Sequence, residues 1–272
     1  MTAPTIGFIG AGNMASSLIG GMLQGSFQPQ QIIASDQNPA QLEQLRSQFG
    51  ITTETDNAVL AQQCDVLVLA VKPQVMQAVC RDLASTRKAG QLVISIAAGI
   101  SCESLTRWLG ADTALIRCMP NTPSLRRQGV SGLYAVPSVS AAQRDLSERI
   151  MNAVGISLWL DQESQIDAVT AVSGSGPAYF FYLMEAMINA GEQLGLPRAT
   201  AERLTLYTAL GAADMAVHSD VDSAELRRRV SSPNGTTEEA INSFARDGFP
   251  DIVVRAMQAA AQRSAELSRE LS

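Results

Sequence analysis

The sequence has few cationic side chains that could take part in catalysis, and its overall charge is negative. Lysine occurs only at Lys72 and Lys88, and histidine only at His218. Asp and Glu together number 26 against 20 for Lys and Arg, which gives a formal net charge of -6 at pH 7. Because nucleic-acid binding requires positive charge to neutralise phosphates, we expect no nucleic-acid partner.

The cysteines are too scattered to form a metal site or a redox pair. Cys64, Cys80, Cys102 and Cys118 include no Cys-x-x-Cys motif. Their apolar neighbours in the sequence favour buried free thiols in a reducing cytosol. We therefore expect no bound metal.

Long hydrophobic runs and a secretory leader are also missing. The most apolar run of the second half, residues 177–190, is too short to span a bilayer and contains Glu185. No basic residue precedes Arg46, so the charged start of a secretory signal is absent. We therefore expect a soluble, cytoplasmic protein without a membrane partner.

What the first half does contain is an alternation of apolar strands and helices, which is typical of a doubly wound sheet. Strands are predicted at residues 5–9, 32–35, 66–71, 92–96 and 114–119, with two more at 131–136 and 156–160 around a helix at 141–153. The strand pattern stops after Asp161, and only helices follow. We therefore predict an α/β protein, with a Rossmann-type dinucleotide-binding domain over residues 1–163 and an all-α domain over 164–272.

The predicted all-α domain contains a helix that one copy can hardly cover. Residues 178–194 are apolar on nearly every side, and such a helix must be buried all round. Two interlocked copies could bury it, so we expect an obligate homodimer and assign this domain to dimerisation. A close-packing loop is predicted before it at residues 173–177, and the remaining helices at 197–216, 223–230, 237–246 and 252–271.

A glycine-rich turn directly follows the first predicted strand. Residues 10–15 (GAGNMA) have the Gly-x-Gly-x-x-Ala form of the dinucleotide fingerprint, placed between a strand and a helix. Gly10 permits the tight turn, Gly12 lets a pyrophosphate approach the backbone, and Ala15 lets the helix pack close to the strand. The helix start faces the phosphates. We therefore predict a nicotinamide dinucleotide cofactor.

The second predicted strand ends at Asp36, where the choice between NADH and NADPH is commonly made. An acidic side chain there accepts a hydrogen bond from the ribose 2′-hydroxyl and repels a 2′-phosphate. Ser35, Gln37 and Asn38 could instead donate to such a phosphate. Asp36 could also simply cap the helix that starts at Asn38-Pro39. The sequence leaves these alternatives open.

Two further strand ends carry residues suited to the same cofactor. Lys72-Pro73 follows the buried strand at 66–71, at the sheet edge where open α/β folds bind ligands. The small residues Ala97, Ala98 and Gly99 follow the next strand, and a flat ring could lie over them.

A polar loop turns into a helix at residues 231–241 (SSPNGTTEEAI). Thr236 and Glu239 have the capping-box spacing, and Asn234-Gly235 allows a tight turn. The free N–H groups of a helix start, with two threonine hydroxyls beside them, can hold a carboxylate. An ordinary well-capped helix is the alternative.

The scarcity of acid–base residues restricts the chemistry. No lysine follows Lys88, and His218 lies in a polar context that looks exposed. A reduction that needs little proton transfer from the protein is therefore favoured. A protonated cyclic imine meets this condition, because it accepts hydride at carbon and becomes an amine. Its carboxylate would bind at Gly235-Thr236-Thr237, and the Thr237 hydroxyl would contact the ring nitrogen.

Six motifs together resemble those of the pyrroline-5-carboxylate reductases over nearly the whole chain. They are FIGAGNM at 8–14, AVKP at 70–73, AAG at 97–99, MPNTP at 119–123, VSGSGPAY at 172–179 and VSSPNGTT at 230–237. The resemblance implies reduction of 1-pyrroline-5-carboxylate to L-proline, the last step of proline biosynthesis, with NADPH or alternatively NADH. It also implies homodimers, often assembled as a decamer of five dimers.

The resemblance implies a set of site residues as well. The implied cofactor contacts, with the residues at the end of the second strand, are Phe8, Ile9, Gly10, Ala11, Gly12, Asn13, Met14, Ser35, Asp36, Asn57, Ala70, Val71, Lys72, Pro73, Ala97, Ala98 and Gly99. The implied substrate contacts are Glu163, Ser232, Gly235, Thr236 and Thr237. Thr237 is the predicted catalytic residue, as a hydroxyl that positions the imine.

Two departures from the family pattern bear on this assignment. Asn234 stands where many relatives have glycine, but asparagine tolerates a left-handed backbone, so the loop should keep its shape. Asp36 stands where relatives that bind a 2′-phosphate often have serine, which makes NADH a competitor. Of two rival functions, a β-hydroxyacid dehydrogenase would need a lysine early in the helix at 178–194, where none occurs. A redox sensor that only binds the nucleotide would not need Thr236 and Thr237.

Overall fold

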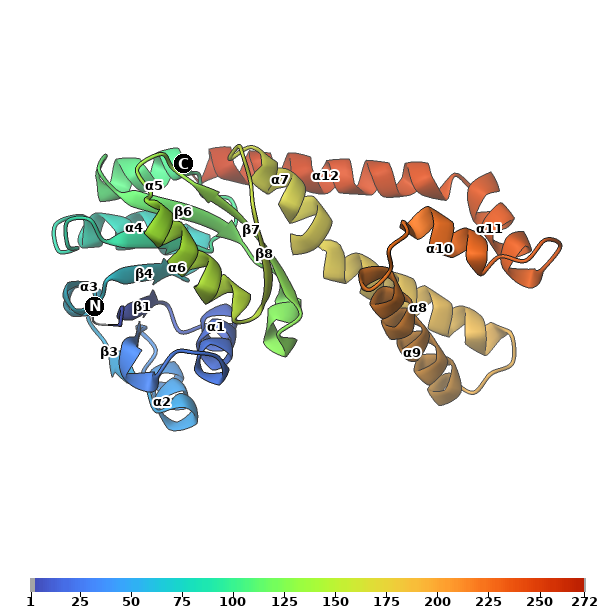
Figure 1. The fold of residues 1–272 in the computed structure, drawn as a ribbon, viewed down its shortest axis with the longest axis horizontal. Coiled ribbons are helices and arrows are strands. Elements are labelled where there is room, and N and C mark those ends of the chain that lie inside the picture. The colour runs from blue at the N-terminus through green and yellow to red at the C-terminus, as the bar shows by residue number, and fades with distance from the viewer. Residues whose placement is uncertain (1–2, 272) are drawn as a thin grey trace. The chain divides into compact units, whose positions relative to one another are not determined.

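The computed structural model describes residues 3–271 and contains an eight-stranded sheet in the order β3-β2-β1-β4-β5-β6-β7-β8 (Figure 1). The strands are β1 (Ile6–Ile9), β2 (Ile32–Ser35), β3 (Thr52–Glu54), β4 (Val66–Leu69), β5 (Leu92–Ser95), β6 (Ala114–Met119), β7 (Gly129–Ala135) and β8 (Gly155–Trp159). Neighbours from β3 to β6 pair in parallel, β7 is antiparallel to β6, and β8 is parallel to β7. The doubly wound α/β fold is therefore confirmed.

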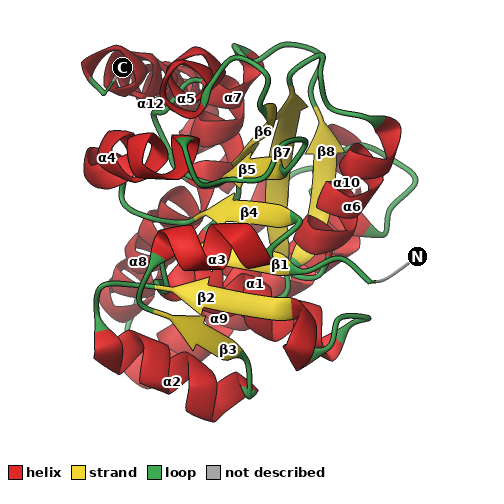
Figure 2. Ribbon diagram, turned by 90° about the vertical axis from the view of Figure 1, so that its left-hand side faces the viewer, coloured by secondary structure: helices red, strands yellow, loops and turns green. Residues whose placement is uncertain are grey.

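Helices cover both faces of this sheet (Figure 2). They are α1 (Asn13–Gln24), α2 (Pro39–Phe49), α3 (Asn57–Gln63), α4 (Pro73–Ala84), α5 (Cys102–Leu109) and α6 (Ala141–Asn152), with short 3-10 turns at Pro29–Gln31 and Thr122–Arg126. One apolar core joins α1, α2 and α6 to the sheet, and a second joins α3, α4 and α5 to the opposite face. β1, β2, β4 and β5 are buried at every position, which explains why their sequences are apolar except for the serine that ends β2 and β5.

The chain divides into two compact units at positions that differ from the predicted domain boundary of 163/164. The first unit takes in the chain up to Ser175 and again from Ala260, and the second is Gly176–Ala259. The second unit contains α8 (Gly176–Gln193), α9 (Arg198–Val217), α10 (Ser223–Arg229), α11 (Thr236–Arg246) and the start of α12 (Phe249–Glu270). The end of α12 therefore belongs to the sheet-containing unit, although the sequence places it in the helical domain.

The loop predicted at residues 173–177 is helical instead. α7 (Gln165–Val169) continues through a π-helical turn (Thr170–Gly174) into α8. The prediction of close packing holds, because a Cβ added at Gly174 would lie 2.6 Å from the Met119 Cε atom. Gly174 therefore allows close contact with β6 and does not interrupt the helix.

Large apolar side chains remain exposed in the second unit. Phe180, Phe181 and Tyr182 of α8 expose 63%, 64% and 75% of their surface, and Tyr207 of α9 exposes 69%. This exposure agrees with the prediction that the helix now labelled α8 is apolar on nearly every side and has no polar face to turn toward water. The single chain leaves this apolar surface uncovered.

The four cysteines are buried free thiols, as predicted. Burial raises the pKa of the Cys64, Cys80 and Cys118 thiols to about 12, and it raises that of Cys102 as well. Within residues 3–271, no group of three or more His, Cys, Asp or Glu side chains is arranged to hold a metal ion. No helix in the same residues combines the length and apolarity needed to cross a bilayer.

Candidate active site

The glycine-rich turn lies between β1 and α1 and has an open approach to its backbone. Gly10 has a φ of 104°, and a Cβ there would lie 2.8 Å from the carbonyl of Ala70. Gly12 is the N-cap of α1, and no side-chain cap bond forms at that helix end in the part of the chain that the structure describes. A Cβ at Gly12 would meet no atom within 4 Å among the described residues. Space for a pyrophosphate thus remains at the start of α1.

Asp36 ties the end of β2 to the glycine-rich turn. The Ala11 N–H donates to Asp36 Oδ2 at 2.8 Å, and the Asn38 N–H donates to Oδ1 at 2.8 Å. The alternative in which Asp36 caps the next helix is wrong, because Asn38 is the N-cap of α2 and accepts from the Ala40 N–H. Asp36 therefore places a carboxylate beside the turn that would hold the nucleotide.

Ser35 and Asn57 are joined to each other. The buried Ser35 hydroxyl donates to Asn57 Oδ1 at 2.6 Å. Ser35 is thus engaged within the fold and is not free to donate to a phosphate, whereas the Asn57 Nδ2 remains as a donor at the start of α3. This arrangement favours Asn57 over Ser35 as a direct nucleotide contact.

The remaining predicted cofactor residues follow strand ends that lie in register. Ile9 pairs with both Ser35 and Leu69, and Leu69 pairs with Ser95. The segments after these strands therefore start at the same edge of the sheet, where open α/β folds bind ligands. Among them, the exposed Lys72 is the N-cap of α4.

The small-residue turn at 97–99 is supported from two sides. The Ser95 hydroxyl oxygen accepts from the Ala97 N–H at 3.4 Å. Gly99 has a φ of 72°, and a Cβ there would lie 3.1 Å from the Leu267 Cβ atom of α12. The end of α12 thus packs directly against this turn, a contact that the sequence did not suggest.

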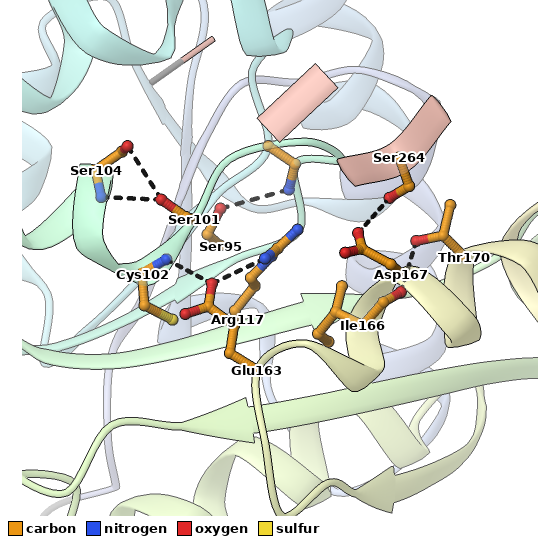
Figure 3. Close-up of polar contacts among 11 residues, drawn as sticks. Ser95, Ser101, Cys102, Ser104, Arg117, Glu163, Ile166, Asp167, Thr170 and Ser264 are labelled. Carbon is orange, nitrogen blue, oxygen red and sulfur yellow. Dashed lines mark hydrogen bonds and ion pairs between the residues drawn. The ribbon is translucent and has the colours of Figure 1, made fainter. Parts of the chain in front are cut away.

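Glu163, a predicted substrate contact, forms two hydrogen bonds through the same carboxylate oxygen (Figure 3). Oε1 accepts from the Cys102 N–H at 2.7 Å and from Arg117 Nη1 at 2.8 Å. The Glu163 side chain is 26% exposed, at the wall of an open hollow of about 630 Å³ that also includes Glu103 and Tyr134. Sequence reasoning missed Arg117, although one charged residue inside an apolar strand is a usable signal.

The loop before α11 leaves the start of that helix uncapped. Gly235, which has no side chain, is the N-cap, Thr236 and Thr237 are the first two helical residues, and within residues 3–271 no side-chain cap bond forms at this end. The capping box predicted for Thr236 and Glu239 is therefore wrong. Glu238 is used instead, because its Oε2 accepts from the Asn234 N–H at 2.6 Å. The φ of Asn234 is 60°, so asparagine does adopt the left-handed backbone.

This helix start can bind an anion. Its first N–H groups have no partner within the helix, and the helix dipole favours negative charge at this end. The Thr236 and Thr237 side chains are exposed, and Ser232 accepts from the Gly235 N–H through its carbonyl at 3.0 Å. Ser232, Gly235, Thr236 and Thr237 are thus brought together by one loop of the second unit, whereas Glu163 belongs to the first.

Comparison with known proteins identifies the family. A protein from Pseudomonas aeruginosa named pyrroline-5-carboxylate reductase is 59% identical over 271 residues, which cover 100% of this chain and 99% of that protein. The chain belongs to the pyrroline-5-carboxylate reductase family. It is therefore an oxidoreductase. The family description "Pyrroline-5-carboxylate reductase dimerisation" matches residues 163–267, and "NADP oxidoreductase coenzyme F420-dependent" matches residues 5–99.

Solved structures of family members have the same fold. A pyrroline-5-carboxylate reductase from Coxiella burnetii is 41% identical with a TM-score of 0.94, covering 98% of this chain and 99% of the other. A Plasmodium falciparum pyrroline carboxylate reductase, solved with NADP bound, is 28% identical with a TM-score of 0.87, again covering 98% and 99%. The family resemblance inferred from the six motifs is thereby confirmed, and so is a nicotinamide nucleotide as the class of cofactor.

Proposed function

We propose that this protein reduces 1-pyrroline-5-carboxylate to L-proline with a nicotinamide nucleotide, as the last step of proline biosynthesis. The observation that carries the proposal is the uncapped start of α11, with Thr236 and Thr237 exposed beside it. In the same chain, the open turn at Gly12 provides for the nucleotide. The 59% identical relative is named for this activity, which supports the choice of substrate.

In this mechanism the protein mainly binds and orients the substrate. The N–H groups at the start of α11 would hold the substrate carboxylate, and the Thr237 hydroxyl would hydrogen-bond the ring nitrogen. When bound, the reduced nucleotide supplies the hydride. The imine, protonated on nitrogen, would accept this hydride at its C=N carbon: the hydride electron pair would form the new C–H bond, and the C=N π electrons would move to nitrogen. Because the product is a neutral amine, no lysine or histidine is required for this step.

The other common acid–base candidates do not compete with this assignment. His218 is 74% exposed at its side chain and contacts Asp214, with 3.3 Å between Nδ1 and Oδ1. α8 contains no lysine, which a β-hydroxyacid dehydrogenase would need there. Thr237 is therefore the proposed catalytic residue, with Ser232, Gly235 and Thr236 as substrate contacts.

Isotope transfer tests this function. With nucleotide in which both hydrogens of the transferring carbon are replaced by deuterium, the protein should convert 1-pyrroline-5-carboxylate into L-proline with one deuterium at the reduced carbon, as measured by mass spectrometry. Proline without deuterium, or no proline at all, would contradict the proposal.

NADPH is the proposed cofactor and NADH the alternative, with Asp36 as the residue that limits the use of NADPH. Its carboxylate, fixed by Ala11 and Asn38, would repel a 2′-phosphate. Asp36→Asn keeps an oxygen acceptor for the Ala11 N–H but removes the charge. We expect it to raise kcat/KM for NADPH about tenfold relative to NADH, or about 1.4 kcal/mol, as measured from initial rates.

Asp36→Ser should change the preference in the same direction but also weaken both nucleotides, because serine is too short to keep both backbone contacts. A control is Asp56→Asn, at the N-cap of α3, where the side chain accepts from the Ala58 N–H. An unchanged NADPH/NADH ratio in Asp36→Asn would rule out charge at this position as the cause.

The oligomer is a further part of the proposal. A homodimer formed through the second unit would cover the exposed aromatic residues of α8, and five such dimers could form a decamer. The family model that matches residues 163–267 describes a dimerisation domain, which supports the homodimer. We propose a cytoplasmic location, in keeping with the buried free thiols.

A further inference from the structure

Arg117 is a charged residue inside an otherwise apolar strand. It is 4% exposed, and its neighbours in β6 are Ile116 and Cys118, both buried. Its Nη1 pairs with Glu163, but its Nη2 is buried without a hydrogen-bond partner among the described residues. A buried ion pair with an unsatisfied donor contributes little net stability, because the desolvation cost offsets the attraction. Stability alone therefore does not explain Arg117.

The position of Arg117 relates it to the small-residue turn. In the sheet register Arg117 is opposite Ser95, the last residue of β5, whose hydroxyl oxygen accepts from the Ala97 N–H. Glu163 then connects Arg117 to the Cys102 N–H, at the first residue of α5. Figure 3 shows the Glu163 carboxylate between the Arg117 guanidinium and Cys102. The segment between β5 and α5, which includes residues 97–99, is thus fixed at both ends.

We propose that Arg117 and Glu163 are positioning residues that hold the turn at 97–99 in the shape required to bind the nicotinamide end of the nucleotide. This inference rests on the proposed function for the place of that ring. In this proposal Glu163 does not contact the substrate, as the sequence led us to expect, but holds the turn by joining β6 to the start of α5. The carboxylate links one buried cation and one backbone N–H, so loss of either link releases the α5 end of the segment from β6.

The link through Cys102 can be cut without touching either charge. Cys102→Pro removes the N–H that donates to Glu163, and proline is well suited to the first position of a helix. The preceding Ser101 has a φ of -77° and a ψ of 157°, which a following proline accepts. The matched control is Cys102→Ala, which also removes the thiol but keeps the N–H.

The measurement is the dissociation constant of NADH and NADPH by fluorescence titration, without imine, so it does not depend on turnover. We expect Cys102→Pro to weaken nucleotide binding about tenfold relative to Cys102→Ala, with similar melting temperatures for the two variants. Glu163→Gln and Arg117→Lys should each weaken nucleotide binding by a similar factor. The variant that combines them should bind nucleotide about as tightly as the more weakly binding single variant, because the two residues act as a unit.

Glu103→Gln is the control for Glu163→Gln, since it removes a carboxylate from the first turn of α5 at the wall of the same hollow but outside the ion pair. Nucleotide binding unchanged in all four test variants would overturn the proposal. So would a Glu163→Gln variant that binds nucleotide normally but shows a raised KM for the imine, because that result assigns Glu163 to the substrate. Failure of the proposed reaction would appear separately, as absent turnover in the wild type.

Discussion

Gly12→Val is expected to weaken NADH and NADPH binding by at least about 100-fold while leaving the melting temperature unchanged. A Cβ at Gly12 would meet no described atom within 4 Å, and the backbone there, with a φ of -72° and a ψ of -177°, suits valine. The valine side chain would instead occupy the space at the start of α1 that the pyrophosphate requires. Fluorescence titration and thermal unfolding measure the two effects.

The contrasting variant is Gly10→Ala, two residues earlier in the same turn. At a φ of 104°, with a Cβ 2.8 Å from the Ala70 carbonyl, alanine should strain the fold and lower the melting temperature. If Gly12→Val bound nucleotide as the wild type does, the pyrophosphate could not lie over this turn. If it unfolded like Gly10→Ala, the turn at Gly12 would have no room for a side chain.

Thr237→Ala is expected to lower kcat for imine reduction about 100-fold and to leave the nucleotide dissociation constant within about twofold. The Thr237 side chain is exposed at the second position of α11, whose N-terminus has no side-chain cap. Loss of the hydroxyl removes the proposed hydrogen-bond partner of the ring nitrogen, whose N–H would donate to the hydroxyl oxygen, but leaves the backbone N–H groups for the carboxylate. Steady-state rates with saturating nucleotide measure the effect.

Thr237→Ser is the matched control, because it keeps the hydroxyl and loses only a methyl group. We expect it to retain most of the activity, whereas Thr237→Val, which keeps the shape without the hydroxyl, should behave like Thr237→Ala. Normal turnover in Thr237→Val would remove the hydroxyl from the mechanism. A large loss of nucleotide affinity in the same variant would place Thr237 at the cofactor instead.

The strands that could be predicted from the sequence are those whose residues are all buried. β4 and β5 are buried on both faces, so their sequences VLVL and LVIS are recognisable without any knowledge of their neighbours. β3 is different, because Thr52–Glu54 lies at the edge of the sheet and has no buried residue. Its threonines favour a strand, but its sequence lacks the apolar pattern of a buried strand, and β2 is its only neighbour in the sheet.

The candidate site was predictable where a local backbone feature sets the function. Gly10 and Gly12 are identified by their spacing after a strand, and the structure gives each a separate steric reason. The helix start at Thr236 was also identified, but its cap was not. The N-cap is Gly235, one residue before the predicted Thr236, so Glu238 and not Glu239 is the third residue of the helix. The Glu238 carboxylate accepts from the Asn234 N–H.

Contacts between distant residues could not be predicted from one sequence. The bond from Ala11 to Asp36 and the pair of Arg117 with Glu163 depend on strand order and register, which a single sequence does not specify. For the same reason, the packing of Leu267 against Gly99 was not expected. These contacts suggest how the cofactor turns are held, whereas the motifs indicate only where the turns are.

The most direct test of the account is the initial rate of nucleotide oxidation by the wild-type protein with 1-pyrroline-5-carboxylate, measured separately with NADPH and with NADH. We predict a rate that saturates with imine for at least one nucleotide, and that falls to the imine-free background in Gly12→Val. If neither nucleotide is oxidised faster with the imine than without it, the proposed function is contradicted.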